Sequence, residues 1–425
     1  MIRFFNNNLN PLLIRELRQF VRNQFITILI SFYVVALVAA CLIVLSSAMA
    51  TGSMTNGQKL FITLGYIMYI TSFFVIVVRT SWNTASDKIS EDLMFFSSMT
   101  PLTIVCGKML SSIIVTLLLM SVTMPFVTMA YLWRGLEPQT IVIVFAIIFI
   151  LLQILNAYAI LVALSGKTKN ANIQTLFSTF ILFFFSNGFL ADMIHILIMK
   201  GSSSFLLNPI FYISIVLSIG FIALLMCGAT VVISPPNSNR SFPMRISLTS
   251  IFLITVGLIV VLSKFFSTLP LTYYTYVAAI TLIALITLTI FMVCERDQWS
   301  TRIRRNLPKS FFLRMIVFPF YSGAACGIVW ILMMVFFIGI FEMLLIPNTT
   351  DLRFFQIKYE DNEIHIPLLL ALVIFTFNYG VTAMLIRSWF FKKLDSAHVK
   401  TILICLLLIF SLGSFLIYLL TETGS

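Results

Sequence analysis

Apolar runs of about 20 residues recur along the whole chain, and they limit its possible folds more than any other feature. A helix rises 1.5 Å per residue, so each run is long enough to cross a hydrocarbon core roughly 30 Å thick. We find eleven such runs, with a range of ten to twelve, separated by polar segments. They cover residues 25–47, 60–79, 109–132, 139–164, 173–199, 209–233, 246–264, 272–293, 319–346, 366–388 and 401–420. The chain is therefore predicted to be an all-α, multi-pass membrane protein.

The composition supports the same class, because 60% of the 425 residues are hydrophobic and only 10% are charged. Soluble domains contain about 45–50% apolar residues.

Ala48-Met49-Ala50 resembles a signal-peptide cleavage site, but the run before it exceeds the roughly 7–15 apolar residues of a signal peptide. We therefore interpret residues 25–47 as a retained first span.

The basic residues are concentrated in alternate polar segments. If the N-terminus is cytoplasmic, 21 of the 27 Lys and Arg residues lie inside and six outside, as the positive-inside rule expects, whereas the acids divide seven to eight. The net charge of +12 is then explained by the cytoplasmic face, and no nucleic-acid partner is needed to explain it. We interpret the densest basic cluster, Arg296 to Arg314, as an orientation signal and a contact for anionic membrane lipids.

Residues 1–24 are predicted to contain a cytoplasmic amphipathic helix. Asn10 can cap its first turn, and Pro11 suits the first helical position because that position needs no N–H partner. Apolar and basic residues fall on different sides: Leu13, Leu17, Phe20 and Val21 on one, and Arg15, Arg18 and Arg22 on the other. Such a helix lies in the membrane interface, although a tail that only sets the topology is an alternative.

The segment 87–108, between the second and third spans, is too polar to span and contains an apolar cluster. Two acids, Glu91 and Asp92, precede this cluster, which consists of Leu93, Met94, Phe95, Phe96 and Met99. Aromatic side chains at a water-facing surface usually mark contact with a partner. We expect Thr100 to cap a helix whose first residue is Pro101, and the third span to start around Gly107-Lys108.

A proline-containing linker, Ser234 to Arg245, divides the spans into six and five, because its prolines cannot continue a helix. We predict a six-span region at 25–235 and a five-span region at 236–425.

In the fifth span, Ser186-Asn187-Gly188 is compatible with either a continuous or an interrupted helix. In the ninth span, Gly323 and Gly327 form a GxxxG pattern that permits close helix packing, within the chain or between two copies.

The chain offers no recognisable catalytic or metal-binding pattern. Its six cysteines and its histidines, His195, His365 and His398, are isolated from one another, so no metal site and no nucleophile–base pair is predicted. The segment LSGKTKN, Leu164 to Asn170, lacks the first glycine of a phosphate-binding loop, so we expect no ATP hydrolysis and no cofactor in this chain. A membrane-embedded hydrolase is the alternative if lone Ser, His and Asp residues converge in the fold.

Polar residues inside the apolar runs leave two interpretations open. Gln153, Asn156, Asn187, Asn378 and Glu342 can line a transport path, or each can hydrogen-bond a neighbouring helix. A secondary transporter driven by an ion gradient would need acids or histidines near the middle of the membrane. Asp192, His195 and Glu342 lie toward the outer ends of their spans, which counts against this second function.

Several features taken together resemble the type-2 ABC transporter permeases, the membrane subunits of many bacterial ABC exporters. The first is the N-terminal helix with Asn10-Pro11 and Arg15-Glu16-Leu17. The second is the segment that leads into the third span, with its acids and apolar cluster followed by Ser97-Ser98, Thr100-Pro101, Ile104-Val105 and Gly107-Lys108. The third is Leu207-Asn208-Pro209 before the sixth span. The resemblance covers residues 1 to about 235, whereas the five further spans depart from the six-span family core.

The resemblance implies that this chain is the permease of an exporter in the bacterial cytoplasmic (inner) membrane, working as a homo- or heterodimer. ATP and Mg²⁺ would bind to a separate ABC ATPase subunit. Glu91 to Pro101 would be the coupling segment that docks into that ATPase, and the helix with Arg15, Glu16, Arg18 and Arg22 would lie along the interface. An interrupted fifth span would supply short half-helices on the outer side. The transported substrate is not indicated by the sequence.

Overall fold

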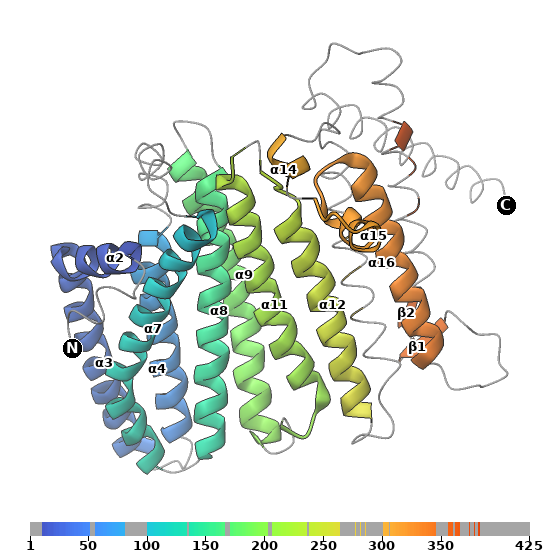
Figure 1. Cartoon of the computed structure of the whole chain (residues 1–425). Helices are drawn as coiled ribbons and strands as arrows, with labels where there is room; N and C mark the ends of the chain where they lie inside the picture. The colour runs from blue at the N-terminus through green and yellow to red at the C-terminus, as the bar shows by residue number, and fades with distance from the viewer. Residues whose placement is uncertain are drawn as a thin grey trace, which may run out of the picture. The chain divides into compact units, whose positions relative to one another are not determined.

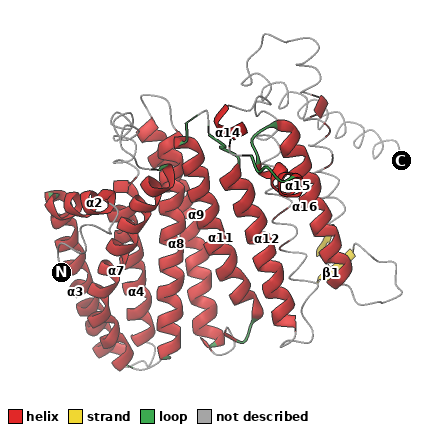
Figure 2. Ribbon diagram, viewed as in Figure 1, coloured by secondary structure: helices red, strands yellow, loops and turns green. Residues whose placement is uncertain are grey.

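A computed structural model describes most of the chain as helices (Figures 1 and 2). The described residues are 11–51, 56–80, 100–133, 136–165, 171–202, 206–235, 238–263, 301–305, 307–345, 356–359 and 362–365, with 277, 281, 285, 374, 378, 381 and 382. The chain divides into two compact units, Met1–Ser234 and Pro235–Ser425. The division falls at the start of the proline-containing linker.

Unit 1 is a bundle of long helices preceded by a short one (Figure 1). Its elements are α2 (Pro11–Arg22), α3 (Gln24–Thr51), α4 (Asn56–Ser72), the π-helical turn η1 (Phe73–Val78), α7 (Pro101–Leu132), α8 (Pro138–Ser165), α9 (Ala171–Lys200) and α11 (Pro209–Ile233). Four of these helices begin with proline, which fits the first helical position because its missing N–H has no intrahelical partner there. At α11, Asn208 Oδ1 also accepts a hydrogen bond from the Ile210 N–H at 3.1 Å.

Unit 2 contains α12 (Phe242–Ser263), α14 (Thr301–Arg305), α15 (Phe311–Val317), the 3₁₀ turn η2 (Phe318–Phe320) and α16 (Ala324–Leu345). It also contains a two-stranded antiparallel hairpin, β1 (Gln356–Tyr359) and β2 (Asn362–His365), in which Gln356 pairs with His365. The hairpin is the one departure from an all-helical fold among the described residues.

Seven helices in the described part of the chain are long and apolar enough to cross a membrane, which confirms a multi-pass membrane protein. They cover Ile26–Ser46, Gly57–Val78, Pro101–Leu132, Pro138–Ser165, Ile173–Ile198, Pro209–Ile233 and Phe242–Leu262. These correspond to the first seven predicted spans. The eighth, tenth and eleventh predicted spans fall almost wholly outside the described residues. The count of eleven therefore stays a prediction.

The fifth span is one continuous helix, α9, so the interrupted alternative is wrong. The polar residues that suggested a break are satisfied without one. Ser186 hydrogen-bonds the Tyr69 hydroxyl of α4 at 2.6 Å, and Asn187 Nδ2 donates to the Phe183 carbonyl at 2.8 Å. A continuous helix therefore accommodates both polar side chains.

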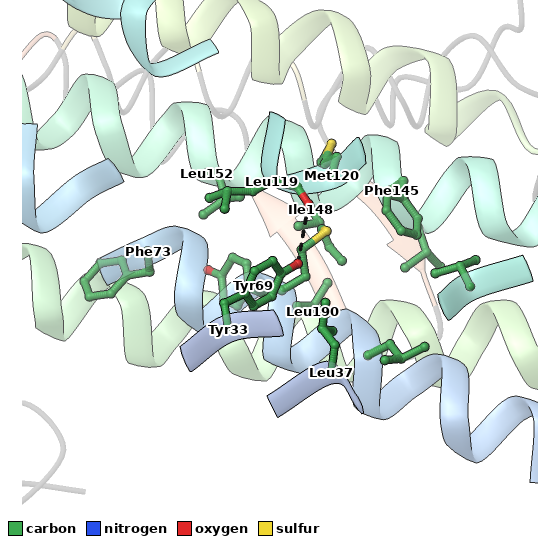
Figure 3. Close-up of a cluster of buried hydrophobic side chains, with 14 of the residues drawn as sticks. Tyr33, Leu37, Tyr69, Phe73, Leu119, Met120, Phe145, Ile148, Leu152 and Leu190 are labelled. Carbon is green, nitrogen blue, oxygen red and sulfur yellow. Dashed lines mark hydrogen bonds between the residues drawn. The ribbon is translucent and has the colours of Figure 1, made fainter. Parts of the chain in front are cut away.

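The core of unit 1 is built from side chains of α3, α4, η1, α7, α8 and α9, together with Phe20 of α2 (Figure 3). Tyr33 and Leu37 of α3, Leu119 of α7, Ile148 of α8 and Leu190 of α9 are fully buried. Phe73 of η1 stacks on Phe183 of α9 with ring centroids 4.0 Å apart. The outward sides of the helices carry exposed Phe, Ile, Leu and Val, which suits a surface in contact with lipid.

A smaller apolar cluster gathers helix ends at one end of the bundle. It joins Leu12 of α2, Ile104 and Val105 of α7, Leu164 of α8 and Ile233 of α11. The cluster thereby holds α2 against the beginning of α7. Figure 1 shows α2 lying crosswise to α3 at this end.

Candidate functional site

The predicted coupling segment leads directly into α7. Its residues Glu91, Asp92, Phe95, Phe96 and Met99 fall outside the described residues, so their contact with an ATPase stays a prediction. Its last two residues are described, and their local structure is as expected. Thr100 has an extended backbone and its Oγ1 accepts a hydrogen bond from the Thr103 N–H at 3.3 Å, while Pro101 is the first helical residue.

The third span begins earlier than expected. α7 runs without interruption from Pro101 to Leu132, so Gly107 and Lys108 lie inside the helix and not at its start. The expectation placed the start at a lysine because a buried charge is unfavourable in an apolar span. In the structure Lys108 has an acidic partner, described below, which removes that objection. One rigid helix therefore connects the end of the coupling segment to the interior of the bundle.

The two sides of α2 are close to those predicted. Arg15, Arg18 and Arg22 are exposed, whereas Leu12, Leu13 and Phe20 are buried. Val21 is 77% exposed, so its placement on the apolar side was wrong. Glu16 is buried with the apolar residues, because it stands three residues after Leu13 and four before Phe20 and so shares their side.

Glu16 forms a buried ion pair with Lys108 of α7. Lys108 Nζ donates to Glu16 Oε1 at 3.4 Å, and the two side chains are 4% and 8% exposed, respectively. Lys108 lies about two turns from the start of α7. Removing two charges from water is costly, and each depends on the other to offset that cost. The pair therefore ties α2 to α7 in one position.

Arg79 joins the same cluster from the end of η1. Its Nη2 donates to the Glu16 backbone carbonyl at 3.2 Å, and its guanidinium carbon lies 4.9 Å from the centre of the Phe20 ring. Burial lowers the pKa of the Arg79 guanidinium, and the negative charge of Glu16 opposes that shift. The Nε atom of Arg79 is buried without a hydrogen-bond partner. We call Glu16, Phe20, Arg79 and Lys108 the α2 junction.

A small cavity lies beside the α2 junction. Its volume is about 10 Å³, close to the minimum that one water molecule needs. Its lining is mixed: Glu16, Arg79, Thr80, Ser111 and Ser112 are polar, and apolar residues of α2, η1 and α7 complete it. A cavity of this size leaves the junction close-packed, so it does not form a transport path.

A second polar group continues from Ser112 into the bundle between α7 and α8. Ser112 Oγ donates to Gln153 Oε1 at 3.1 Å, and Gln153 Nε2 donates to Thr116 Oγ1 at 3.0 Å. Asn156 Nδ2 donates to Ser112 Oγ at 2.8 Å, while Asn156 Oδ1 has no partner. Gln153 and Asn156 thus bind a neighbouring helix, one of the two alternatives left by the sequence. They tie α8 to the helix that carries Lys108.

The titratable residues expected of an ion-driven carrier do not converge in the described part of the chain. Asp192 and His195 are exposed on α9, and the side chain of Glu342 lies outside the described residues. Asn378, one of the uncharged polar residues that could line a path, is also exposed. Within the described residues, no three His, Cys, Asp or Glu side chains lie close enough to hold a metal ion.

Gly323 and Gly327 do not lie in the same helix, so whether they pack against another helix stays a prediction. α16 begins at Ala324, and Gly323 precedes it with a φ of 138°, a left-handed conformation that favours glycine. The Gly323 carbonyl accepts a hydrogen bond from the Gly327 N–H at 2.9 Å and so closes the first turn of α16. The predicted continuous span 319–346 is therefore wrong at its beginning, because the apolar residues before Gly323 belong to η2 and a turn.

A buried arginine stabilises this turn in unit 2. Arg245 of α12 is 0% exposed, and its Nη1 donates to the carbonyls of Pro319 at 2.8 Å and Tyr321 at 2.6 Å. Its Nη2 donates to the Gly323 carbonyl at 3.4 Å. The sequence placed Arg245 in a linker as one of many orientation charges, and no local spacing indicated these contacts.

The sequence also missed the α2 junction. A usable signal was the position of Glu16 on the apolar side of its helix, since a buried acid requires a partner. Nothing near Lys108 or Arg79 identified them as that partner.

Comparison of the chain with profiles of known protein families, with characterised proteins and with solved structures finds no significant match.

Proposed function

We propose that this chain is the transmembrane permease subunit of an ABC transporter in a bacterial cytoplasmic membrane, and that it exports its substrate. A separate ATPase subunit binds ATP and Mg²⁺ and contacts the coupling segment, Glu91 to Pro101. The permease works as a dimer, with its N-terminus and α2 on the cytoplasmic side.

The observation that supports this proposal most is the connection between the coupling segment and the bundle. The segment ends at Thr100, the cap of α7, and Pro101, its first helical residue. α7 also carries Lys108, which binds Glu16 of α2. A force applied to the segment therefore acts on one end of a continuous helix and, through a buried ion pair, on the helix that lies crosswise to the bundle.

The same helix also connects to the interior. The hydrogen bonds of Ser112 and Thr116 with Gln153 and Asn156 join α7 to α8 about three to four turns beyond the start of α7. When the ATPase subunits close on ATP, movement of α7 takes α2 and α8 with it. Rocking of these helices against the rest of the bundle then alternates access from the two sides of the membrane.

Co-expression of the tagged chain with the products of its flanking genes tests the proposal. We expect an ATP-hydrolysing protein to co-purify, and the double substitution of Phe95 and Phe96 by Asp to abolish its binding. Leu207→Asp is the matched control, because Leu207 is an exposed apolar residue between α9 and α11, at the other end of the bundle. The proposal fails if no ATPase associates and the Phe95/Phe96 variant retains transport.

A further inference from the structure

Helix α15 presents an apolar surface that is almost fully exposed. None of its seven residues is buried, and Phe311, Phe312, Met315 and Ile316 are 78%, 77%, 69% and 64% exposed, respectively. An apolar patch of this kind normally marks contact with a membrane or a partner.

α15 meets α16 at a right angle. The segment Phe311–Phe320 and the segment Ala325–Phe341 form an angle of 89°. In Figure 1, α16 is seen from the side while α15 is seen nearly along its axis. The two segments together qualify as one further candidate span, and α16, with 22 residues or about 33 Å of helix, supplies the longer part of it. If α16 crosses the membrane, α15 lies parallel to its surface.

Buried hydrogen bonds maintain this angle. Arg245 binds three carbonyls of the η2 turn and its exit, and Gly323 adopts a backbone conformation that other residues rarely reach. Backbone carbonyls at a helix end need hydrogen-bond partners from outside the helix, and the Arg245 guanidinium supplies such bonds here. The right-angle turn is therefore a stabilised feature of unit 2.

The residues around α15 carry only positive charge. Residues 301–323 include five Lys or Arg residues and no Asp or Glu. Arg304, Arg305, Lys309 and Arg314 are exposed. Basic side chains next to an apolar helix suit an anionic bilayer surface, with charges at the headgroups and apolar side chains in the acyl boundary.

We propose that α15 is a membrane-interface anchor whose apolar side chains insert beside α16 and whose flanking basic residues bind anionic phospholipids. Each basic side chain near an anionic membrane surface strengthens binding to that surface by roughly five-fold. The anchor therefore enriches anionic lipid at this position, and it sets the depth of α16 in the bilayer.

Photocrosslinking in lipid nanodiscs tests the proposal on the full chain. The probes are phosphatidylglycerol and phosphatidylcholine, each with a diazirine either near the glycerol or at the end of the acyl chain, and mass spectrometry maps the labelled peptides. We expect the glycerol-proximal probe to label residues 301–317 at least about five-fold more from phosphatidylglycerol than from phosphatidylcholine. The triple variant Arg304→Gln, Arg305→Gln and Lys309→Gln should remove this preference.

Two further variants separate lipid binding from general effects. Lys59→Gln removes an exposed lysine of unit 1 and should leave the labelling of 301–317 unchanged. Phe311→Ser with Phe312→Ser should lower labelling by both lipids. Equal labelling by the two lipids overturns the lipid selectivity, and labelling mainly by the chain-end probe overturns the interfacial position. Absence of labelling by any probe shows that protein covers α15, either a partner or a second copy of the chain.

Discussion

Removing the charge of Glu16 is the most direct perturbation of the α2 junction. Breaking a buried ion pair by removing one partner costs about 3–5 kcal/mol. The 3.4 Å separation of Lys108 Nζ and Glu16 Oε1 exceeds the roughly 2.7–2.9 Å of a strong charge-assisted hydrogen bond, so we expect the lower end of that range, about 3 kcal/mol, for Glu16→Gln. Lys108→Met should cost less, about 1–2 kcal/mol, because Glu16 then retains Arg79 as a nearby cation.

The double variant Glu16→Gln, Lys108→Met separates the pair from its surroundings. It leaves Arg79 without a nearby anion but removes the unpaired lysine, so its cost should be about 2 kcal/mol. The coupling energy between the two positions is then about 2–3 kcal/mol, at the upper end of values for residues in contact.

Thermal unfolding of the purified protein in detergent, followed by circular dichroism, measures these differences. With about 2–4 °C per kcal/mol for a unit of this size, Glu16→Gln should lower Tm by roughly 6–12 °C. Arg18→Gln on the exposed side of α2 is the control and should leave Tm unchanged. A coupling energy below about 0.5 kcal/mol would refute the ion pair as an energetic link. A larger cost for Lys108→Met than for Glu16→Gln would refute the supporting role of Arg79.

Two other predictions concern the packing of each unit. Leu119→Ala removes a fully buried side chain of the unit 1 core and should lower the free energy of unfolding by about 2–5 kcal/mol. Its neighbour Leu118 is 45% exposed, so Leu118→Ala should change that free energy by no more than about 0.5 kcal/mol. Thermal unfolding in detergent measures both variants. Arg245→Met removes the three hydrogen bonds that the guanidinium donates to turn carbonyls. It should destabilise the α15–α16 turn by about 2–4 kcal/mol, seen as faster hydrogen exchange of residues 318–327 with little change in α8.

The spans of unit 1 were predictable because their ends carry local signals. α11 runs from Pro209 to Ile233, the predicted bounds, because Asn208 and Pro209 start it and the prolines after Ser234 prevent its continuation. Hydropathy was less reliable where a charge is buried. It placed the start of the third span near Lys108, about two turns late, because it treats every lysine as though it had no partner.

The ninth span shows a different limit of the sequence. The residues before Gly323 are as apolar as a membrane helix, so no hydropathy signal marks the turn there. The turn depends on the positive φ of one glycine and on hydrogen bonds from Arg245, which lies more than 70 residues earlier. Contacts of this kind have no local pattern, and the same holds for Glu16 and Lys108, which are 92 residues apart.

The α2 junction suggests a role for the ion pair that stability alone does not explain. Leu12 shares an apolar cluster with Ile104 and Leu164, and apolar packing is non-directional, so by itself it would allow α2 to slide along α7. A buried ion pair often adds no more stability than apolar residues would, but it permits only one alignment of the two helices. If α2 must follow α7 during transport, the pair is needed for alignment. The double variant Glu16→Gln, Lys108→Met should then assemble with the ATPase and fold, yet lose most of its transport.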